Sequence, residues 1–325
     1  MSEKALQDLS SHTPDNTAGV SPDPEKDYRI GVLCVLGCQL FWGVCPIYWQ
    51  ALEPIPSWII ILYRIVTMFV YSYIAARFRF TREEIWQPLR DKAIRRKYFT
   101  AGLILTINWS IYIWAMTSER VIQASIGYYI EPIVICAVGI IVFREKLTKY
   151  NLTAMICALI AIIIILLHYR QVPGVALGLA GSWAVYSAIK KTSEIPVLTA
   201  LVYETMIYAV IATIAIIYIE TKGIGAISLG VPGKYAMMFL SGLITLIPVA
   251  LFSVSAKKVS LLVIGLAQYI SPTMSLLLGI FLFKEPIDRT QIIAFVIIWA
   301  GLAVFTYGEF LSNKKALASE AESNR

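Results

Sequence analysis

The sequence predicts an all-α membrane protein of ten transmembrane helices, arranged as two inverted five-helix repeats. Three observations lead to this fold class: the composition, the spacing of the apolar blocks and an internal repeat. Of the 325 residues, 58% are apolar and only 15% are charged, whereas ordinary soluble domains hold about 45–50% apolar and about 25% charged residues. The apolar residues gather in long blocks, and a block of about 18 or more can cross the hydrocarbon core.

Ten such blocks are expected to form membrane-spanning helices. They cover residues 30–51, 57–76, 98–117, 121–143, 149–168, 174–190, 197–219, 235–256, 260–283 and 290–310. Short polar segments separate them, and only the basic segment Arg77–Lys97 is a sizeable loop. Residues 1–29 are polar and mixed in charge, so we expect a disordered tail there. Residues 311–325 form a second polar tail.

The chain repeats itself at a constant offset of 140 residues. Tyr129–Pro132 (YIEP) recurs as Tyr269–Pro272 (YISP), and a glutamate follows each proline at the same distance, at Glu145 and Glu285. We therefore assign residues 30–168 to a first repeat and residues 174–310 to a second. Because each repeat holds five helices, an odd number, the two copies enter the membrane from opposite sides. Inverted repeats of this kind recur in transporters, where two halves exchange conformations; the alternative is a duplication kept for packing alone.

The distribution of positive charge predicts the orientation. If the N-terminus is cytoplasmic, the cytoplasmic segments hold 21 of the 28 Lys and Arg residues, the outside segments hold six, and Arg64 lies inside a span. Cytoplasmic loops retain an excess of Lys and Arg. We therefore expect a multi-pass protein of the cell membrane with both termini cytoplasmic.

Several function classes find little support in the residues. The net charge of +7 lies in short loops between spans, as topology signals do, which argues against a nucleic-acid partner. The five cysteines lie inside apolar blocks without metal-ligand spacing, and no His/Cys/Glu cluster offers a metal site. No Gly-rich phosphate loop appears, so we expect neither a nucleotide cofactor nor direct ATP drive. Titratable pairs for acid–base catalysis are scarce, which leaves an intramembrane enzyme as a second hypothesis.

Three charged residues stand out inside the predicted spans, away from the span ends: Arg64, Glu131 and Glu204. A charge at mid-bilayer costs about 2.5 kcal/mol or more, so it is expected to face the bundle interior and to have a partner. Arg64 and Glu204 are related by the 140-residue offset, which predicts an ion pair between the repeats, either structural or part of a solute site. Glu131 is expected either to exchange protons during transport or to pair with Arg64 or a freed backbone carbonyl.

Further residues complete the predicted solute and ion pathway. Asn108 and Tyr112 share a helix face, Tyr128 precedes Glu131 by one turn, and Gln268 and Ser271 lie on a face of the second copy. Aromatic walls with few polar groups suit a flat or amphipathic organic solute, although many aromatic residues serve packing or the lipid interface instead. Pro46, Pro132, Pro248 and Pro272 are the predicted helix breaks, because proline cannot donate a backbone hydrogen bond.

These residues, in this order, make the chain resemble the drug/metabolite transporter superfamily, and within it the RarD branch of the EamA-type transporters. The resemblance runs from about Ile30 to Glu309. It is carried by Phe41-Trp42-Gly43 with Pro46 and Tyr48, Arg64, Asn108-Trp109 with Tyr112-Ile113-Trp114, Gly127-Tyr128-Tyr129-Ile130 with Pro132, Glu145, Glu204-Thr205, and Gln268-Tyr269-Ile270 with Pro272-Thr273. It implies ten helices, inverted repeats, a central cavity and secondary transport, often efflux.

Two positions depart from the pattern of the family. Similar sequences usually have His where this chain has Tyr63, and Asn where it has Glu131. No solute carries over from the resemblance. We expect a secondary transporter that exports small organic metabolites or drugs by alternating access, with proton coupling as an option; an intramembrane enzyme and a solute channel are the alternatives.

Overall fold

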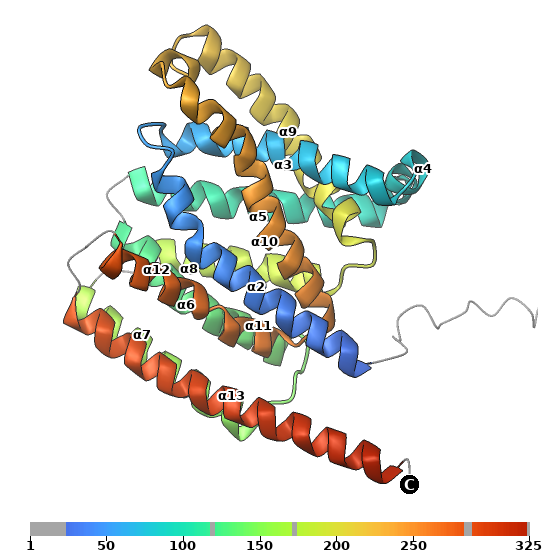
Figure 1. The fold of residues 1–325 in the computed structure, drawn as a ribbon, viewed down its shortest axis with the longest axis vertical. Helices are drawn as coiled ribbons and strands as arrows, with labels where there is room; N and C mark the ends of the chain where they lie inside the picture. The colour runs from blue at the N-terminus through green and yellow to red at the C-terminus, as the bar shows by residue number, and fades with distance from the viewer. Residues whose placement is uncertain (1–23, 118–120, 171–173, 283–287, 324–325) are drawn as a thin grey trace, which may run out of the picture.

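A computed structural model describes residues 24–117, 121–170, 174–282 and 288–323. Within these ranges every regular element is a helix, and all ten predicted spans fall on helices (Figure 1). The long helices are α2 (Pro24–Gln50), α3 (Ser57–Arg79), α5 (Lys92–Thr117), α6 (Val121–Ile141), α7 (Lys149–Tyr169), α8 (Gly174–Lys191), α9 (Val197–Thr221), α10 (Tyr235–Lys258) and α13 (Arg289–Ser323). The ninth predicted span forms two shorter helices, α11 (Leu261–Ala267) and α12 (Ile270–Phe281).

Seven of the described helices are long and apolar enough to cross a membrane, by length and composition. They lie within Glu25–Gln50, Ser57–Arg79, Lys149–Tyr169, Val197–Thr221, Pro232–Lys258, Leu261–Phe281 and Arg289–Leu311. The other three predicted spans fall on α5, α6 and α8, of which α6 has a shorter apolar part, Ile126–Ile141. The outer faces of the bundle carry many exposed aliphatic side chains, such as Val210, Ile214 and Val296, as a lipid-facing surface requires. The chain is therefore a multi-pass membrane protein.

Both predicted tails need correction at their inner ends. Helix α2 begins at Pro24, so residues 24–29 are helical rather than part of a disordered tail. Proline fits the first turn of a helix, and the acidic residues Glu25 and Asp27 there favour the positive end of the helix dipole. Helix α13 continues to Ser323, because Ala, Leu, Lys and Glu, all good helix formers, follow Asn313. Residues 1–23 and 324–325 lie outside the described residues.

The basic segment Arg77–Lys97 is also more regular than a loop. It contains α4 (Arg82–Trp86) and the short helix η1 (Gln87–Arg90) before α5 begins. Thr81 and Glu84 form a reciprocal capping box at the start of α4, in which each side chain accepts the backbone N–H of the other residue. The segment after α9 likewise holds two short helices, η2 (Ile227–Leu229) and η3 (Pro232–Lys234).

The helices pack in pairs that correspond between the two halves of the chain. Helix α2 packs on α10 and α8 on α5; α3 packs on α10 and α9 on α5; α2 packs on α12 and α8 on α6. All of these pairs join one half of the chain to the other, as do three more: α3 with α9, α6 with α11, and α7 with α13. Helices α7 and α13 lie together at one edge of the molecule (Figure 1).

Glycines allow two equivalent helix crossings. A Cβ atom on Gly102 of α5 would lie 2.0 Å from the carbonyl oxygen of Glu204 on α9. A Cβ atom on Gly242 of α10 would lie 2.3 Å from the backbone nitrogen of Met68 on α3. Backbones approach this closely only where the side chain is absent. Gly102 and Gly242 are 140 residues apart, so the repeat seen in the sequence marks matching contacts.

The predicted proline breaks are wrong at three of four positions. Pro46, Pro132 and Pro248 lie inside the continuous helices α2, α6 and α10. A proline removes one hydrogen bond of a helix, and neighbouring helices hold the rest of the turn in place. The break in the described chain lies at Gln268 and Tyr269, between α11 and α12, one turn before Pro272.

Candidate functional site

The first candidate residue, Arg64, lies in α3 with its guanidinium between two indole rings. Its Cζ atom is 4.4 Å from the ring centre of Trp109 on α5 and 5.4 Å from that of Trp49 on α2. Stacking of this kind suits arginine, whose guanidinium is planar and weakly hydrated. The Nε atom is buried and has no hydrogen-bond partner. Arg64 therefore has an unused hydrogen-bond donor beside a wall of aromatic rings.

Two tyrosines extend this wall. Tyr112, on the turn of α5 after Trp109, meets Tyr128 of α6 edge to face at 6.2 Å and is hydrogen-bonded to it. Both tyrosines lie within electrostatic range of Arg64. Tyr128 is 44% exposed. The cluster around Arg64 therefore has an accessible face at this ring.

Glu131 follows Tyr128 by three residues on α6, so the two side chains share a face. It is partly buried and lies within electrostatic range of Tyr128. Among the residues that the structure describes, no cation forms an ion pair with it, so the predicted alternative of pairing with Arg64 is not found. The carboxyl group of Glu131 is therefore not committed to an ion pair among the described residues.

The predicted ion pair between Arg64 and Glu204 is wrong. Glu204 of α9 accepts a hydrogen bond from the Nζ atom of Lys190 at 2.7 Å and another from the Tyr186 hydroxyl at 2.9 Å, both from α8. The side chains of Lys190 and Glu204 are 1% and 0% exposed. Equivalent positions in two repeats meet only when they lie on the symmetry axis, and here each side chain turns toward helices of its own repeat.

Sequence reasoning missed Lys190 as the partner of Glu204. Lys190 lies in the last turn of α8, and five residues connect α8 to α9, so Lys190 and Glu204 face one another across a helical hairpin. The repeat gave no signal for this pair, because the position equivalent to Lys190 holds the uncharged Gln50. Glu204 therefore bonds to groups of α8 rather than to Arg64.

Of the remaining predicted residues, some bond to neighbouring helices, and one has polar atoms without a hydrogen-bond partner. Asn108 donates to the Leu179 carbonyl at 3.0 Å and to Ser182 Oγ at 2.9 Å, which joins α5 to α8. Gln268, at the break between α11 and α12, is 4% exposed, and both polar atoms of its amide lack partners. The Ser271 carbonyl approaches Gly43 of α2. Asn108 therefore serves packing, whereas Gln268 keeps its hydrogen-bonding capacity free.

Glu145 was recognised only as a repeated position, and the structure gives it a contact. Its carboxylate accepts the backbone N–H groups of Leu261 and Leu262 at 2.7 and 2.9 Å, and it lies 3.3 Å from Lys191 Nζ. It thus ties the first repeat to the start of α11 in the second. Its counterpart Glu285 lies outside the described residues.

The cluster of Arg64, Trp49, Trp109, Tyr112 and Tyr128 can bind an organic solute but offers no reactive pair. A cation, aromatic faces and phenol hydroxyls recognise a flat solute that carries an acceptor or negative group. Among the described residues no three His, Cys, Asp or Glu side chains gather in a way that could hold a metal ion.

Comparisons with known proteins agree with this picture. Residues 29–167 and 173–307 each match the EamA-like transporter family. The chain is 35% identical over 286 residues to the uncharacterized transporter YojE of Bacillus subtilis, covering 86% of this chain and 94% of that one. It is 28% identical over 300 residues to the protein RarD of Streptomyces exfoliatus, covering 90% and 93%.

The fold has a counterpart among solved structures. A crystal structure superimposes with a TM-score of 0.66 at 16% identity, over 85% of this chain and 97% of that one. At this identity the likeness concerns the fold alone. The family match, in contrast, covers nearly all of the described helices in two successive copies. The chain belongs to the EamA-like transporter family, within which its relatives include RarD proteins.

Proposed function

We propose that this protein is a secondary active transporter that exports small organic metabolites or drugs across the cell membrane by alternating access. The aromatic cluster around Arg64 is its solute site. The observation that carries this proposal is the unpartnered Nε atom of Arg64, held between Trp49 and Trp109 and beside two tyrosines. A buried donor without a partner is costly, so a site that keeps one has a ligand for it.

Ten membrane-spanning helices in two inverted repeats form the framework of this mechanism. Support comes from the paired packing, in which contacts between the two halves occur in equivalent pairs, such as α2 with α10 and α8 with α5. Apolar clusters repeat as well: Ile55, Ile60 and Met238 form one, and their counterparts at the 140-residue offset, Ile195, Ala200 and Tyr98, form another. Two halves with matching contacts can exchange conformations with little cost, which is the basis of alternating access.

The solute is expected to be flat or amphipathic with one acceptor or negative group. The ring faces of Trp49 and Trp109 are already occupied by the Arg64 guanidinium, so the solute would add a further layer against Tyr112 and Tyr128. Its polar group would take the free donor of Arg64. Gln268, with both amide atoms free, is the second polar contact that we assign to the pathway.

Glu131 is the proposed proton-coupling group. It shares a helix face with Tyr128, and none of the described cations pairs with it. A carboxyl group that meets water from one side and then the other can carry a proton against the solute. The competing role is a structural hydrogen bond within α6.

The orientation has both termini in the cytoplasm, supported by the excess of Lys and Arg in that set of segments. A single cysteine placed at Arg82, in a background without the native cysteines, should resist a membrane-impermeant thiol reagent in intact cells. A single cysteine placed at Glu53 should react. Labelling at Arg82 together with protection at Glu53 would reverse the orientation.

The transport test begins with a thermal-shift screen of the purified protein against a metabolite and drug library, because a ligand stabilises the state that binds it. A compound that raises the melting temperature is then tested for counterflow in proteoliposomes. A carrier exchanges labelled for unlabelled solute, whereas a channel lets the label equilibrate without transient accumulation. Absence of counterflow for every stabilising compound would contradict secondary transport.

A further inference from the structure

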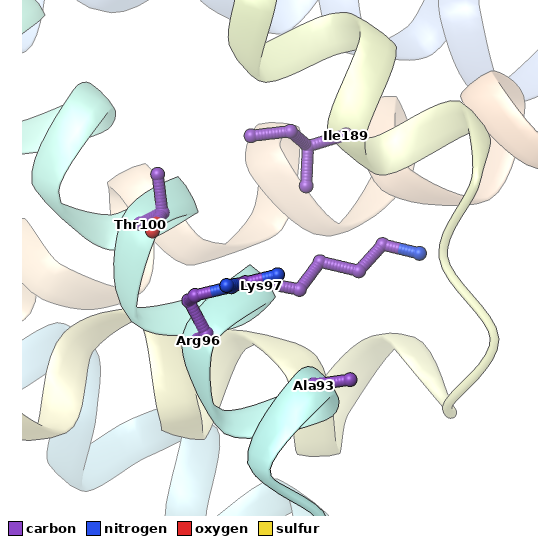
Figure 2. A pocket seen from close by; sticks show the side chains of 5 residues that line it. All are labelled: Ala93, Arg96, Lys97, Thr100 and Ile189. Atoms are coloured by element: carbon purple, nitrogen blue, oxygen red, sulfur yellow. The ribbon is translucent and has the colours of Figure 1, made fainter.

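A pocket with a volume of about 390 Å³ opens between α5 and α8, away from the cluster around Arg64. Four of its lining residues, Ala93, Arg96, Lys97 and Thr100, come from α5, and Ile189 faces them from α8 (Figure 2). The spacing of three, four and seven residues puts the α5 side chains on one face of the helix. The pocket thus lies where the basic segment meets the first turns of a long helix.

The pocket is positively charged. The guanidinium of Arg96 is exposed, and none of the ion pairs among the described residues involves it. Lys97 is held in place by the Thr192 carbonyl and by Glu194, whose carboxylate lies 3.1 Å from Lys97 Nζ but is 73% exposed. Lys257 of α10 is within electrostatic range of Lys97. Glu194 pairs with Lys97 alone among the described ion pairs, so positive charge exceeds negative charge around the pocket.

An apolar stripe continues from this pocket along both helices. Leu103 and Ile107 follow Thr100 on the same face of α5 and are 46% and 44% exposed. Val185, one turn before Ile189 on α8, is 48% exposed. The site therefore joins a phosphate-binding group, a hydroxyl and apolar walls to a lipid-facing apolar track. A soluble phosphate would match only the first part of this surface.

We propose that this pocket binds the headgroup of an anionic phospholipid, with an acyl chain lying along Leu103, Ile107 and Val185. Arg96 contacts the phosphate, since a guanidinium binds phosphate oxygens in a bidentate manner. Basic pockets between membrane helices on the cytoplasmic side bind acidic headgroups in this way. The bound lipid would hold α5 against α8, the pair that Asn108 already joins. This assignment does not depend on which solute is carried.

Native mass spectrometry of the purified full chain tests the proposal, with phosphatidylglycerol and phosphatidylcholine offered at equal concentration. We expect one phosphatidylglycerol molecule to be retained in preference to phosphatidylcholine. The variant Arg96→Ala should bind it roughly fivefold more weakly, the effect expected for one basic residue near a membrane surface. Arg82→Ala, which removes an exposed charge from α4 outside the pocket, is the matched control and should bind within about twofold of the parent.

A second variant separates the pocket from diffuse attraction. Ala93→Trp keeps every charge but fills the space, so selective binding should fall as it does in Arg96→Ala, at an unchanged melting temperature. Unaltered binding by Ala93→Trp, or an equal loss in Arg82→Ala, would overturn the proposal. Displacement of the lipid by inorganic phosphate at comparable concentration would also overturn it, because the site would then recognise soluble phosphate. Lipid binding is measured without any transport assay. Failure of the lipid proposal can therefore be told apart from failure of the proposed transport function.

Discussion

Arg64 and Glu204 occupy equivalent positions on α3 and α9, 140 residues apart, yet their surroundings are opposite. Glu204 is enclosed, with an ion pair to Lys190 and a hydrogen bond from Tyr186. Arg64 is only partly buried, stacks on aromatic rings and leaves its Nε atom unpartnered. Equivalent positions in the two repeats therefore differ in their bonding: one is fully paired with protein groups, and the other keeps a free donor, which is why we propose a solute role for Arg64 and not for Glu204.

The same contrast holds for the two glutamates within the membrane helices. Both carboxylate oxygens of Glu204 accept hydrogen bonds from protein donors, whereas Glu131 has no ion-pair partner among the described residues. Glu204 is thus bonded to groups of α8, whereas the carboxyl group of Glu131 has no such commitment. This contrast underlies the proposal that Glu131, and not Glu204, couples protons to transport.

The largest effect is expected where the paired position is broken. Lys190→Met leaves the Glu204 carboxylate buried without its cation, which typically costs about 3–5 kcal/mol. We expect a large loss of folded protein, measured by fluorescence-detected size exclusion after heating. The double variant Lys190→Met/Glu204→Gln removes the orphan charge, keeps an acceptor for Tyr186 and should regain most of that stability. Gln50→Met, at the position equivalent to Lys190, is the control and should change little.

Removal of the Arg64 guanidinium should affect transport far more than stability. A hydrogen bond to a charged group contributes about 1.5–3 kcal/mol, so Arg64→Ala should lower the transport rate about tenfold or more at limiting solute. Its melting temperature should stay near that of the parent, because only stacking on two indole rings is lost. Arg64→Lys should rescue transport poorly, since an ammonium group does not reproduce the planar stack. Full rescue by lysine would show that charge alone matters there.

Glu131→Gln tests the second contrast. The amide keeps the shape and hydrogen bonding of the carboxyl group but cannot titrate. The variant should exchange labelled solute at equal pH on both sides of a proteoliposome, and it should lose the acceleration that an imposed pH gradient produces in the parent. A gradient that drives the variant as strongly as the parent would assign Glu131 a structural role.

The smallest effect concerns coupling between the two equivalent positions. Because Glu204 turns to α8 and Arg64 to α2 and α5, the stability changes of Arg64→Ala and Glu204→Gln should add within about 0.5 kcal/mol. A double-mutant cycle read by thermal unfolding measures this. A coupling above about 1 kcal/mol would restore the direct pair that the sequence alone predicts.

Much of the fold follows from the sequence, because apolar block length and the repeat are long-range patterns that local errors do not erase. All ten predicted spans fall on helices, and Gly102 and Gly242 mark equivalent crossings. The partner of Glu204 could not be obtained in this way. An offset relates positions to one another, but only the hairpin geometry between α8 and α9 brings Lys190 to the carboxylate.

The members of the candidate site follow only partly from the sequence. Arg64, Tyr112 and Tyr128 are predicted pathway residues that the structure places together. Trp49 and Trp109, whose rings lie against Arg64, are not among the predicted pathway residues. Asn108 has a packing role that its polarity alone does not reveal. The sequence predicts helix breaks at four prolines, whereas the structure has a break at Gln268 and Tyr269. A proline lowers the free-energy cost of a break, but the packing of neighbouring helices decides where a break forms.

Counterflow per folded molecule tests the central claim most directly, namely that Arg64 serves transport and Glu204 serves stability. Arg64→Ala and Lys190→Met/Glu204→Gln would be reconstituted at equal amounts of folded protein, with a solute identified by thermal shift in the parent. We predict that the Arg64 variant loses exchange about tenfold or more, while the double variant exchanges at close to the parental rate. Parental exchange by Arg64→Ala, or loss of exchange by the folded double variant, would contradict the account.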